Sequence, residues 1–305
     1  MKKLLAALTA FLLLLFCSCD ANFGVIARIE FSNGGKTAEA RHITYDLFAV
    51  EGKQVDPLPL LENIKPKLDY GKLLSAFGME KADYTSFSDP AGRKYKTETK
   101  TLVVYESGLI SFSDTSLYGK GNTFTDEQLR QTGEETAKNA GLDLSELTLA
   151  EWLSAEEART AAYDRKIGGV EAVGRTGMNI TYNGDGISGL TYLASTYKNK
   201  TEQTLLTVGE AAKLLLTEES SQSFGREVGV AVKAIETVTV TDVDLVYWDS
   251  TYTQTRMMQT HIQPVYRFTG ICLDTDGKES PFTGYVRAVP DSETTDFYVD
   301  PETIN

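Results

Sequence analysis

Strand-like runs of hydrophobic residues account for most of this chain. Two such runs, residues 101–106 and 109–112, meet at Ser107-Gly108, and this arrangement is typical of a β-hairpin. Alternating or continuous apolar runs bounded by glycine-rich turns predict further strands in the same way. These strands are expected over residues 147–152, 158–167, 170–173, 178–182, 187–193, 238–248, 262–273 and 284–289.

Three short segments have helical periodicity instead. Apolar residues recur at i, i+3, i+4 and i+7 over residues 70–77, directly after Asp69, which is a suitable N-cap. A Thr-x-x-Gln capping box starts at Thr125, and a Thr-x-x-Glu box starts 82 residues later at Thr207. Gly133 weakens the second helix, because glycine inside a helix costs about 1 kcal/mol relative to alanine. Helices are therefore predicted to begin close to Asp69, Thr125 and Thr207.

A helix followed by several antiparallel strands recurs along the chain. This order predicts an α+β fold of two or three repeated modules, each a helix packed on an antiparallel β-sheet. The N-terminal α+β module is expected over residues 36–118, a second module over 119–199, and a C-terminal module with an acidic tail over 200–305. Such a module leaves one sheet face free for water or a partner.

The N-terminus has the features of a bacterial lipoprotein signal. Two lysines follow Met1, the apolar run over residues 4–16 comes next, and a small residue precedes Cys19. We expect residues 1–18 to be a cleaved signal peptide, Cys19 to carry the lipid, and residues 19–35 to be the anchor and tether. Cys17 is a poorer candidate because a bulky phenylalanine precedes it. The sequence thus predicts a protein anchored on the extracytoplasmic face of the cell membrane.

Charge and cysteine content narrow the range of partners. The chain carries 30 Lys and Arg against 43 Asp and Glu, a net charge of −13. An acidic surface disfavours nucleic acid, whose binding requires a basic surface. Once Cys19 is acylated, Cys272 has no thiol partner, so a buried apolar thiol is expected there and stability must come from packed cores.

Common catalytic and metal-binding signatures are missing from the sequence. His42 and His261 are its two histidines, so a zinc site made from His and Cys lacks ligands. No G-x-S-x-G, P-loop or C-x-x-C motif is present. The glycine pattern over residues 184–189 precedes a strand rather than a helix, which favours a hairpin turn over a dinucleotide site. Residues 274–277 likewise indicate a turn and lack the Glu of a calcium loop. We expect no catalytic residues, cofactor or metal.

Acidic pairs and tyrosines are the remaining candidate side chains. Neighbouring carboxylates such as Glu134-Glu135 and Glu156-Glu157 point in different directions and are expected to be solvated. Most of the 15 tyrosines are expected to pack across strands, while a few on an open sheet face or a groove between modules would suit protein or peptide binding. The candidates for that contact surface are Tyr182, Tyr192, Tyr266 and Tyr285.

Several segments resemble known extracytoplasmic modules. Residues 163–170 (YDRKIGGV) and 178–190 (MNITYNGDGISGL) resemble the strand pair of PepSY-like domains, and residues 206–212 (LTVGEAA) resemble their opening helix. The closing strands over 263–270 (QPVYRFTG) and 285–289 resemble those of the YycH/YycI-type regulatory proteins of Gram-positive bacteria. The resemblance implies a PepSY-like second module, a YycI-like C-terminal module and a non-enzymatic role.

These observations together predict a non-enzymatic cell-surface lipoprotein that binds or regulates an envelope protein or peptide partner, in a signalling or peptidase system. YycH/YycI-type proteins are typically held by a transmembrane helix, so contact with a sensor kinase inside the bilayer does not carry over to a cleaved lipoprotein. The alternative is an envelope hydrolase that acts on glycan or peptidoglycan through a carboxylate pair. A solute-capturing lipoprotein is less favoured because the chain lacks long βα alternation.

Overall fold

The computed structural model describes residues 43–64, 66–88, 91–174, 177–194, 196–199, 202–217, 219–225, 235–249 and 261–294. In these ranges the chain is mostly β, with sixteen strands in one mixed sheet and three α-helices. The strands are β1 (Thr44–Asp46), β2 (Leu61–Ile64), β3 (Asp83–Ser88), β4 (Ala91–Lys96), β5 (Lys100–Tyr105), β6 (Leu109–Asp114), β7 (Leu147–Ala155), β8 (Ala158–Ile167), β9 (Val170–Val173), β10 (Met178–Asn183), β11 (Gly186–Leu193), β12 (Thr196–Asn199), β13 (Ser220–Ser223), β14 (Ile235–Trp248), β15 (His261–Asp274) and β16 (Glu279–Arg287). The helices are α2 (Tyr70–Ala76), α3 (Asp126–Asn139) and α4 (Val208–Leu215).

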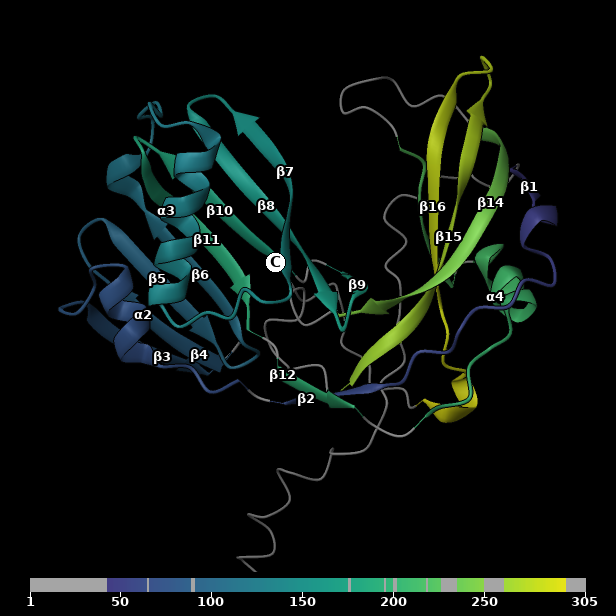
Figure 1. The fold of residues 1–305 in the computed structure, drawn as a ribbon, viewed down its shortest axis with the longest axis horizontal. Coiled ribbons are helices and arrows are strands. Elements are labelled where there is room, and N and C mark those ends of the chain that lie inside the picture. Colours follow the sequence, from purple (N-terminus) through teal and green to yellow (C-terminus); the bar gives the residue numbers. More distant parts are fainter. Residues whose placement is uncertain are drawn as a thin grey trace, which may run out of the picture.

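The sheet is bent into two lobes (Figure 1). Its main path runs β12-β2-β15-β14-β9-β8-β10-β11-β6-β5-β4-β3, with β1, β7, β13 and β16 attached beside that path. The first lobe contains β3 to β8, β10 and β11, and the second is built around β14, β15 and β16 (Figure 1). β9 links them, because it pairs with β8 on one side and with β14 on the other.

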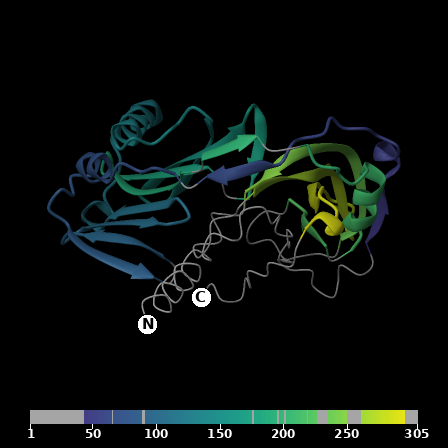
Figure 2. The same ribbon diagram turned by 90° about the horizontal axis from the view of Figure 1, so that it is seen from below.

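The first lobe has its core between the sheet and two helices. Helices α2 and α3 lie on the same side of that sheet (Figure 2). Leu73 of α2 and Leu129 of α3 are fully buried in one cluster with apolar residues of β5, β6, β10 and β11. The Phe77 ring stacks on Phe112 with 4.2 Å between ring centroids. The hydrophobic effect of this burial holds the short helices in place, since helices of their length are marginal alone.

The second lobe packs α4 against the long strands β14, β15 and β16. Val208 and Leu215 of α4 are buried in a cluster with Phe268 and Phe282. Cys272 is fully buried in the same cluster, which confirms the prediction of a buried thiol. β1 adds to this lobe in parallel with β14.

The predicted local signals are confirmed. Asp69 caps α2, and complete capping boxes at Thr125 and Thr207 start α3 and α4. The hairpin at residues 107–108 joins β5 to β6, and the turn at 184–185 joins β10 to β11. These features depend on hydrogen bonds between residues close in sequence, so sequence is enough to predict them.

The predicted fold class is wrong. The described residues do not form repeated helix-on-sheet modules but one large mixed sheet, in which β1 and β9 run parallel to β14. Pairing also crosses the predicted boundary at 118/119, because β11 pairs with β6. The helices cover faces of the sheet and not its edges, so the backbone groups at the strand edges pair with strands from other predicted modules. The boundaries themselves stay predictions.

The lipoprotein features lie outside the described residues. Residues 1–18, the lipid acceptor Cys19, the tether over 19–35 and His42 all fall before residue 43, and most of the acidic tail falls after residue 294. Among the described residues, no helix has the length and apolar content needed to cross a membrane.

Candidate functional site

The four tyrosines predicted from the sequence do not form one exposed surface. Tyr182, Tyr192 and Tyr266 are buried, and they belong to two different cores. The Tyr192 hydroxyl donates to the Asp143 carbonyl at 2.9 Å, and the Tyr266 hydroxyl donates to a backbone carbonyl at 2.5 Å. Tyr285 is half-buried against Trp248, with 6.0 Å between ring centroids. The expectation that these rings centre an accessible surface is therefore corrected: three of them are core residues.

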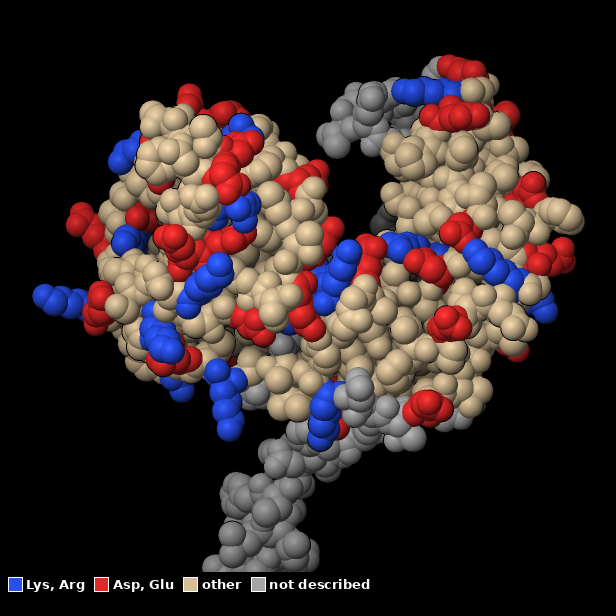
Figure 3. Space-filling view, in the orientation of Figure 1, with Lys and Arg blue, Asp and Glu red and all other residues tan. Residues whose placement is uncertain are grey.

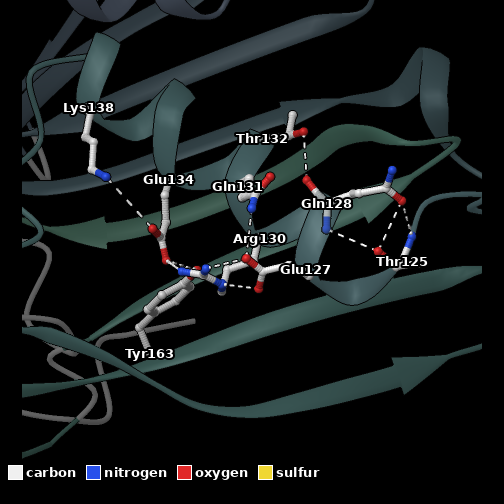
Figure 4. Close-up of polar contacts among 9 residues, drawn as sticks. All are labelled: Thr125, Glu127, Gln128, Arg130, Gln131, Thr132, Glu134, Lys138 and Tyr163. Atoms are coloured by element: carbon white, nitrogen blue, oxygen red, sulfur yellow. Dashed lines mark hydrogen bonds and ion pairs between the residues drawn. The ribbon is translucent and has the colours of Figure 1, made fainter.

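Two acidic residues of α3, Glu127 and Glu134, form an ion-pair network, whereas Glu135 is exposed as predicted (Figure 4). The Arg130 guanidinium pairs with Glu127 at 2.7 Å and with Glu134 at 2.8 Å, and Lys138 lies 3.9 Å from Glu134. The Tyr163 hydroxyl donates to Glu134 at 3.3 Å. These bonds raise the pKa of Arg130 and lower the pKa of Glu127. The network connects α3 to β8, and its charged side chains are paired with one another.

A polar groove of about 530 Å³ lies along β8 and β9 and contains a pair of carboxylates, Asp164 and Glu171. Glu171 is bonded to the Arg267 guanidinium at 2.5 Å, and Arg267 also pairs with Asp244 at 2.6 Å. Glu171 is therefore already paired with a cation. Every carboxyl pKa that is clearly shifted among the described residues is lowered, namely those of Glu127, Asp143, Asp185, Glu210 and Asp242.

The described residues were expected to contain no metal site, and His261 is the one histidine among them. His261 is buried in β15, where it pairs in register with Glu62 of β2. In the described ranges no group of three or more His, Cys, Asp or Glu is arranged to hold a metal ion. The turn at residues 274–277 is closed by the Asp274 carboxylate, which accepts from the Asp276 and Lys278 amides at 2.9 Å, so the predicted turn is confirmed.

A second groove, of about 440 Å³, lies at the end of the sheet formed by β3. We call it the Arg93 groove. Among the residues that line it are Leu68, Tyr70, Tyr84, Ser86, Arg93 and Glu106.

Strand register places the groove residues together. Tyr84 pairs with Tyr95, and Ser86 pairs with Arg93, across β3 and β4. Because alternate residues of a strand point to one face, these four side chains share a face of the sheet. It is the face that carries α2, since the rings of Tyr70 at the start of α2 and of Tyr95 are 6.2 Å apart. The groove thus lies between the start of α2 and the outermost strands.

Arg93 is held by aromatic rings. Its guanidinium carbon lies 4.4 Å from the centroid of the Tyr70 ring, within the range of a cation–π contact. A hydrogen bond with Tyr95 and the nearby Tyr70 raise the pKa of Arg93, and burial raises the pKa of Tyr70. Arg93 is exposed, and among the described residues no carboxylate forms an ion pair with it. A positioned cation therefore faces solvent in an aromatic groove.

On the opposite face of the same strands, Gly92 leaves room for a contact between two aromatic rings. The Phe87 ring crosses Gly92 and meets the Tyr105 ring edge-on, with 5.8 Å between centroids. A β-carbon on Gly92 would lie 2.6 Å from the Phe87 ring and 2.9 Å from the Val104 carbonyl oxygen. Gly92 thus permits the ring contact that holds β3 against β4 and β5.

Two further properties make the edge at β3 suitable for binding a partner. In the described chain β3 is hydrogen bonded only to β4, so its outer edge is open, and Tyr84 on it is 55% exposed. Residues 66–100 contain seven Lys and Arg against five Asp and Glu, whereas the whole chain has 30 against 43. Figure 3 shows Lys and Arg side chains over the part of the first lobe that carries α2, β3 and β4. Residues 66–100 thus carry a small excess of positive charge in an acidic protein, with the basic residues beside β3 rather than on it, since β3 contains Asp83 and no Lys or Arg.

Sequence reasoning missed this groove. The segment over residues 83–96 was not predicted as strands, although Tyr84 and Ser86 on one side of Asp89-Pro90 mirror Arg93 and Tyr95 on the other. This symmetry around Asp89-Pro90 is a signal that the sequence itself contains.

Comparisons with known proteins give little further information. No protein-family model matches the sequence, and no curated protein matches it significantly. Among solved structures, the chain is similar to the YpeB C-terminal domain of Bacillus megaterium, with 11% sequence identity and a TM-score of 0.35. The match covers 70% of this chain and 95% of that chain. This distant structural likeness does not place the chain in a family.

Proposed function

We propose that this chain is a non-enzymatic lipoprotein of the extracytoplasmic face of the cell membrane, anchored through Cys19, and that it binds an envelope protein through the Arg93 groove. The observation that carries the proposal is the Arg93 guanidinium stacked 4.4 Å over Tyr70 without an ion-pair partner among the described residues. An arginine held in this way binds a carboxylate or a carbonyl at low entropic cost, because its planar side chain is already ordered.

The composition of the groove supports a protein partner. Tyrosine and arginine are enriched among the residues that contribute most to protein interfaces. Here Tyr84 is exposed yet packs beside Tyr95 of the neighbouring strand, with 5.3 Å between ring centroids. A ring packed in this way gives contact area while losing little rotamer freedom on binding.

The state of the carboxyl groups supports a binding role over a hydrolytic one. A glycoside hydrolase needs one carboxylic acid with a raised pKa to protonate the leaving group. The clearly shifted carboxyl groups of the described residues have lowered pKa values instead. In the carboxylate pair of the polar groove, Glu171 is neutralised by Arg267.

Quantitative co-isolation tests the proposal. The tagged protein would be isolated from membranes of cells that produce it, as wild type, Arg93→Ala and Lys213→Ala, where Lys213 is an exposed cation on α4. We expect specific proteins that are recovered with wild type and with Lys213→Ala but reduced about tenfold or more with Arg93→Ala, because a lost charge pair costs at least that much affinity. Equal recovery with all three variants would refute the proposed function.

A further inference from the structure

We infer that the ligand of the Arg93 groove is an acidic segment of extended polypeptide, which adds to β3 as a further antiparallel or parallel strand. The inference rests on the proposed function and specifies the chemistry of the partner at the same site. It follows from three features of β3 and its surroundings: an open strand edge, a cation behind that edge, and an exposed aromatic ring on it.

The edge of β3 is well formed for strand addition. β3 pairs with β4 in regular register from Asp83↔Lys96 to Ser88↔Ala91. Natural edge strands are usually protected by lysine, proline or a bulge. The sequence of β3, DYTSFS, contains no lysine or proline, and its one charged residue, Asp83, is its first residue, away from Ser86. Its outer N–H and C=O groups can therefore pair with an extended chain, as in other cases of β-augmentation.

Four other strands of the described chain, β1, β7, β12 and β13, also pair on one side only. β1 has three residues and β12 and β13 have four each, and edge strands this short offer little backbone for pairing. β7 is longer but irregular. β7 pairs only with β8, and its register shifts between Leu149 and Glu151. Such a bulge twists a strand and interrupts its edge. The hairpin that ends β7 also places Glu156 in a left-handed conformation with φ of 51°. β7 is thus a protected edge, and β3 is not.

The charge behind the edge selects an acidic chain. Ser86 of β3 is directly opposite Arg93 of β4, so a short side chain separates the open edge from the guanidinium. Neighbouring strands lie about 4.8 Å apart, which puts an added strand about 10 Å from β4. A Glu side chain facing Ser86 would span that gap together with the long Arg93 side chain. Glu106 also lines the groove, and two carboxylates repel each other. The ligand carboxylate therefore has to approach Arg93 from the β3 side.

The next inward-facing position of the ligand meets Tyr84, which lies two residues before Ser86 on the same face of β3. A cross-strand neighbour of an exposed tyrosine is favourable when it is aromatic or β-branched. The segment that fits therefore contains an acidic residue and an apolar residue two positions apart, and both side chains face the groove.

Peptide binding tests the inference. The probe is a labelled nine-residue peptide in which Glu and Val alternate with Thr, measured by fluorescence anisotropy against the mature chain. Two matched peptides carry Lys in place of Glu, or N-methyl groups on alternate residues that block strand hydrogen bonds. We expect the Glu peptide to bind about tenfold or more tightly than either matched peptide. Arg93→Ala should remove that preference, and Lys213→Ala should not.

Three results would overturn the inference. Equal binding of the Glu and Lys peptides would exclude charge selection, and equal binding of the N-methylated peptide would exclude strand addition. Competition by polyphosphate as effective as that by the Glu peptide would identify an anionic polymer as the ligand instead. Arg93-dependent co-isolation without a preference for the Glu peptide would leave the proposed function in place, whereas peptide binding without Arg93-dependent co-isolation would contradict the proposed function alone.

Discussion

Replacement of Gly133 by alanine should destabilise the protein, although alanine is the better helix former. Gly133 lies inside α3 and is buried against the sheet. A β-carbon there would lie 2.0 Å from the Tyr182 hydroxyl oxygen and 2.9 Å from the Ile180 Cδ1 atom. Tyr182 is fully buried, so its ring has no free space to move into. The glycine that weakens the sequence-based helix prediction is the residue that lets α3 approach the sheet.

Two opposing contributions set the size of the effect. Helix propensity favours alanine over glycine by about 0.5–1 kcal/mol. Inserting a methyl group into a packed core costs about 1–3 kcal/mol, and contacts this short belong at the upper end. The free energy of unfolding of Gly133→Ala should therefore fall by about 1–2 kcal/mol. Gly209→Ala in α4 is the matched control, because a β-carbon there has no atom within 4 Å and should not destabilise.

A double-mutant cycle with Tyr182→Phe isolates the contact. The Tyr182 hydroxyl has no hydrogen-bond partner in the described structure, so its removal should be neutral or stabilising by up to about 1 kcal/mol. It also removes the atom that meets the new methyl group, so the pair should couple by about 1 kcal/mol. Urea denaturation followed by circular dichroism measures all four proteins. A more stable Gly133→Ala protein, or strictly additive effects, would refute the packing argument.

Three further predictions follow from other parts of the chain. Cys19→Ala should move the protein from the membrane fraction to the soluble extracytoplasmic fraction, because acyl chains supply the anchoring energy; unchanged fractionation and lipid labelling would point to Cys17 or an uncleaved helix. Gly92→Ala should lower the melting temperature and weaken peptide binding, since its β-carbon would lie 2.9 Å from a backbone oxygen; unchanged values would show that β3 adjusts freely. Asp185 accepts from the Phe124 amide at 2.8 Å, and bonds led by the Thr123 hydroxyl lower its pKa. Its contribution to stability is present above its unfolded-state pKa and is lost as pH falls through the lower folded-state value. Asp185→Ala should therefore lower the melting temperature at pH 7, with the difference shrinking below about pH 4; a constant difference would contradict this.

Local features of the fold could be predicted from the sequence. The starts of the three helices follow from Asp69, Thr125 and Thr207, because a cap bonds to residues within the next turn. The hairpins follow from glycines at residues that need positive φ, such as Gly108 with φ of 95° and Gly184 with φ of 57°.

The global arrangement could not be predicted in this way. Strand periodicity shows which residues share a face but not which strand lies beside which, so the pairing of β11 with β6 and the parallel pairs with β14 have no local signal. The same limit explains why buried tyrosines were predicted to lie on an exposed surface. Alternation places Tyr182 and Tyr192 on one face, but only the positions of α2 and α3 show that this face is covered. The Arg93 groove likewise depends on Tyr70, which is distant in sequence from β4.

Site-directed photo-crosslinking in living cells tests the central claim most directly. A photoreactive phenylalanine analogue would replace Tyr84, which is 55% exposed at the open edge, or Tyr118, which is 56% exposed and does not line the groove. The account predicts that position 84 crosslinks to a discrete envelope protein, that Arg93→Ala abolishes this product, and that position 118 gives none. Equal products from both positions, or a product at position 84 that persists with Arg93→Ala, would contradict the assignment of the Arg93 groove as the binding surface.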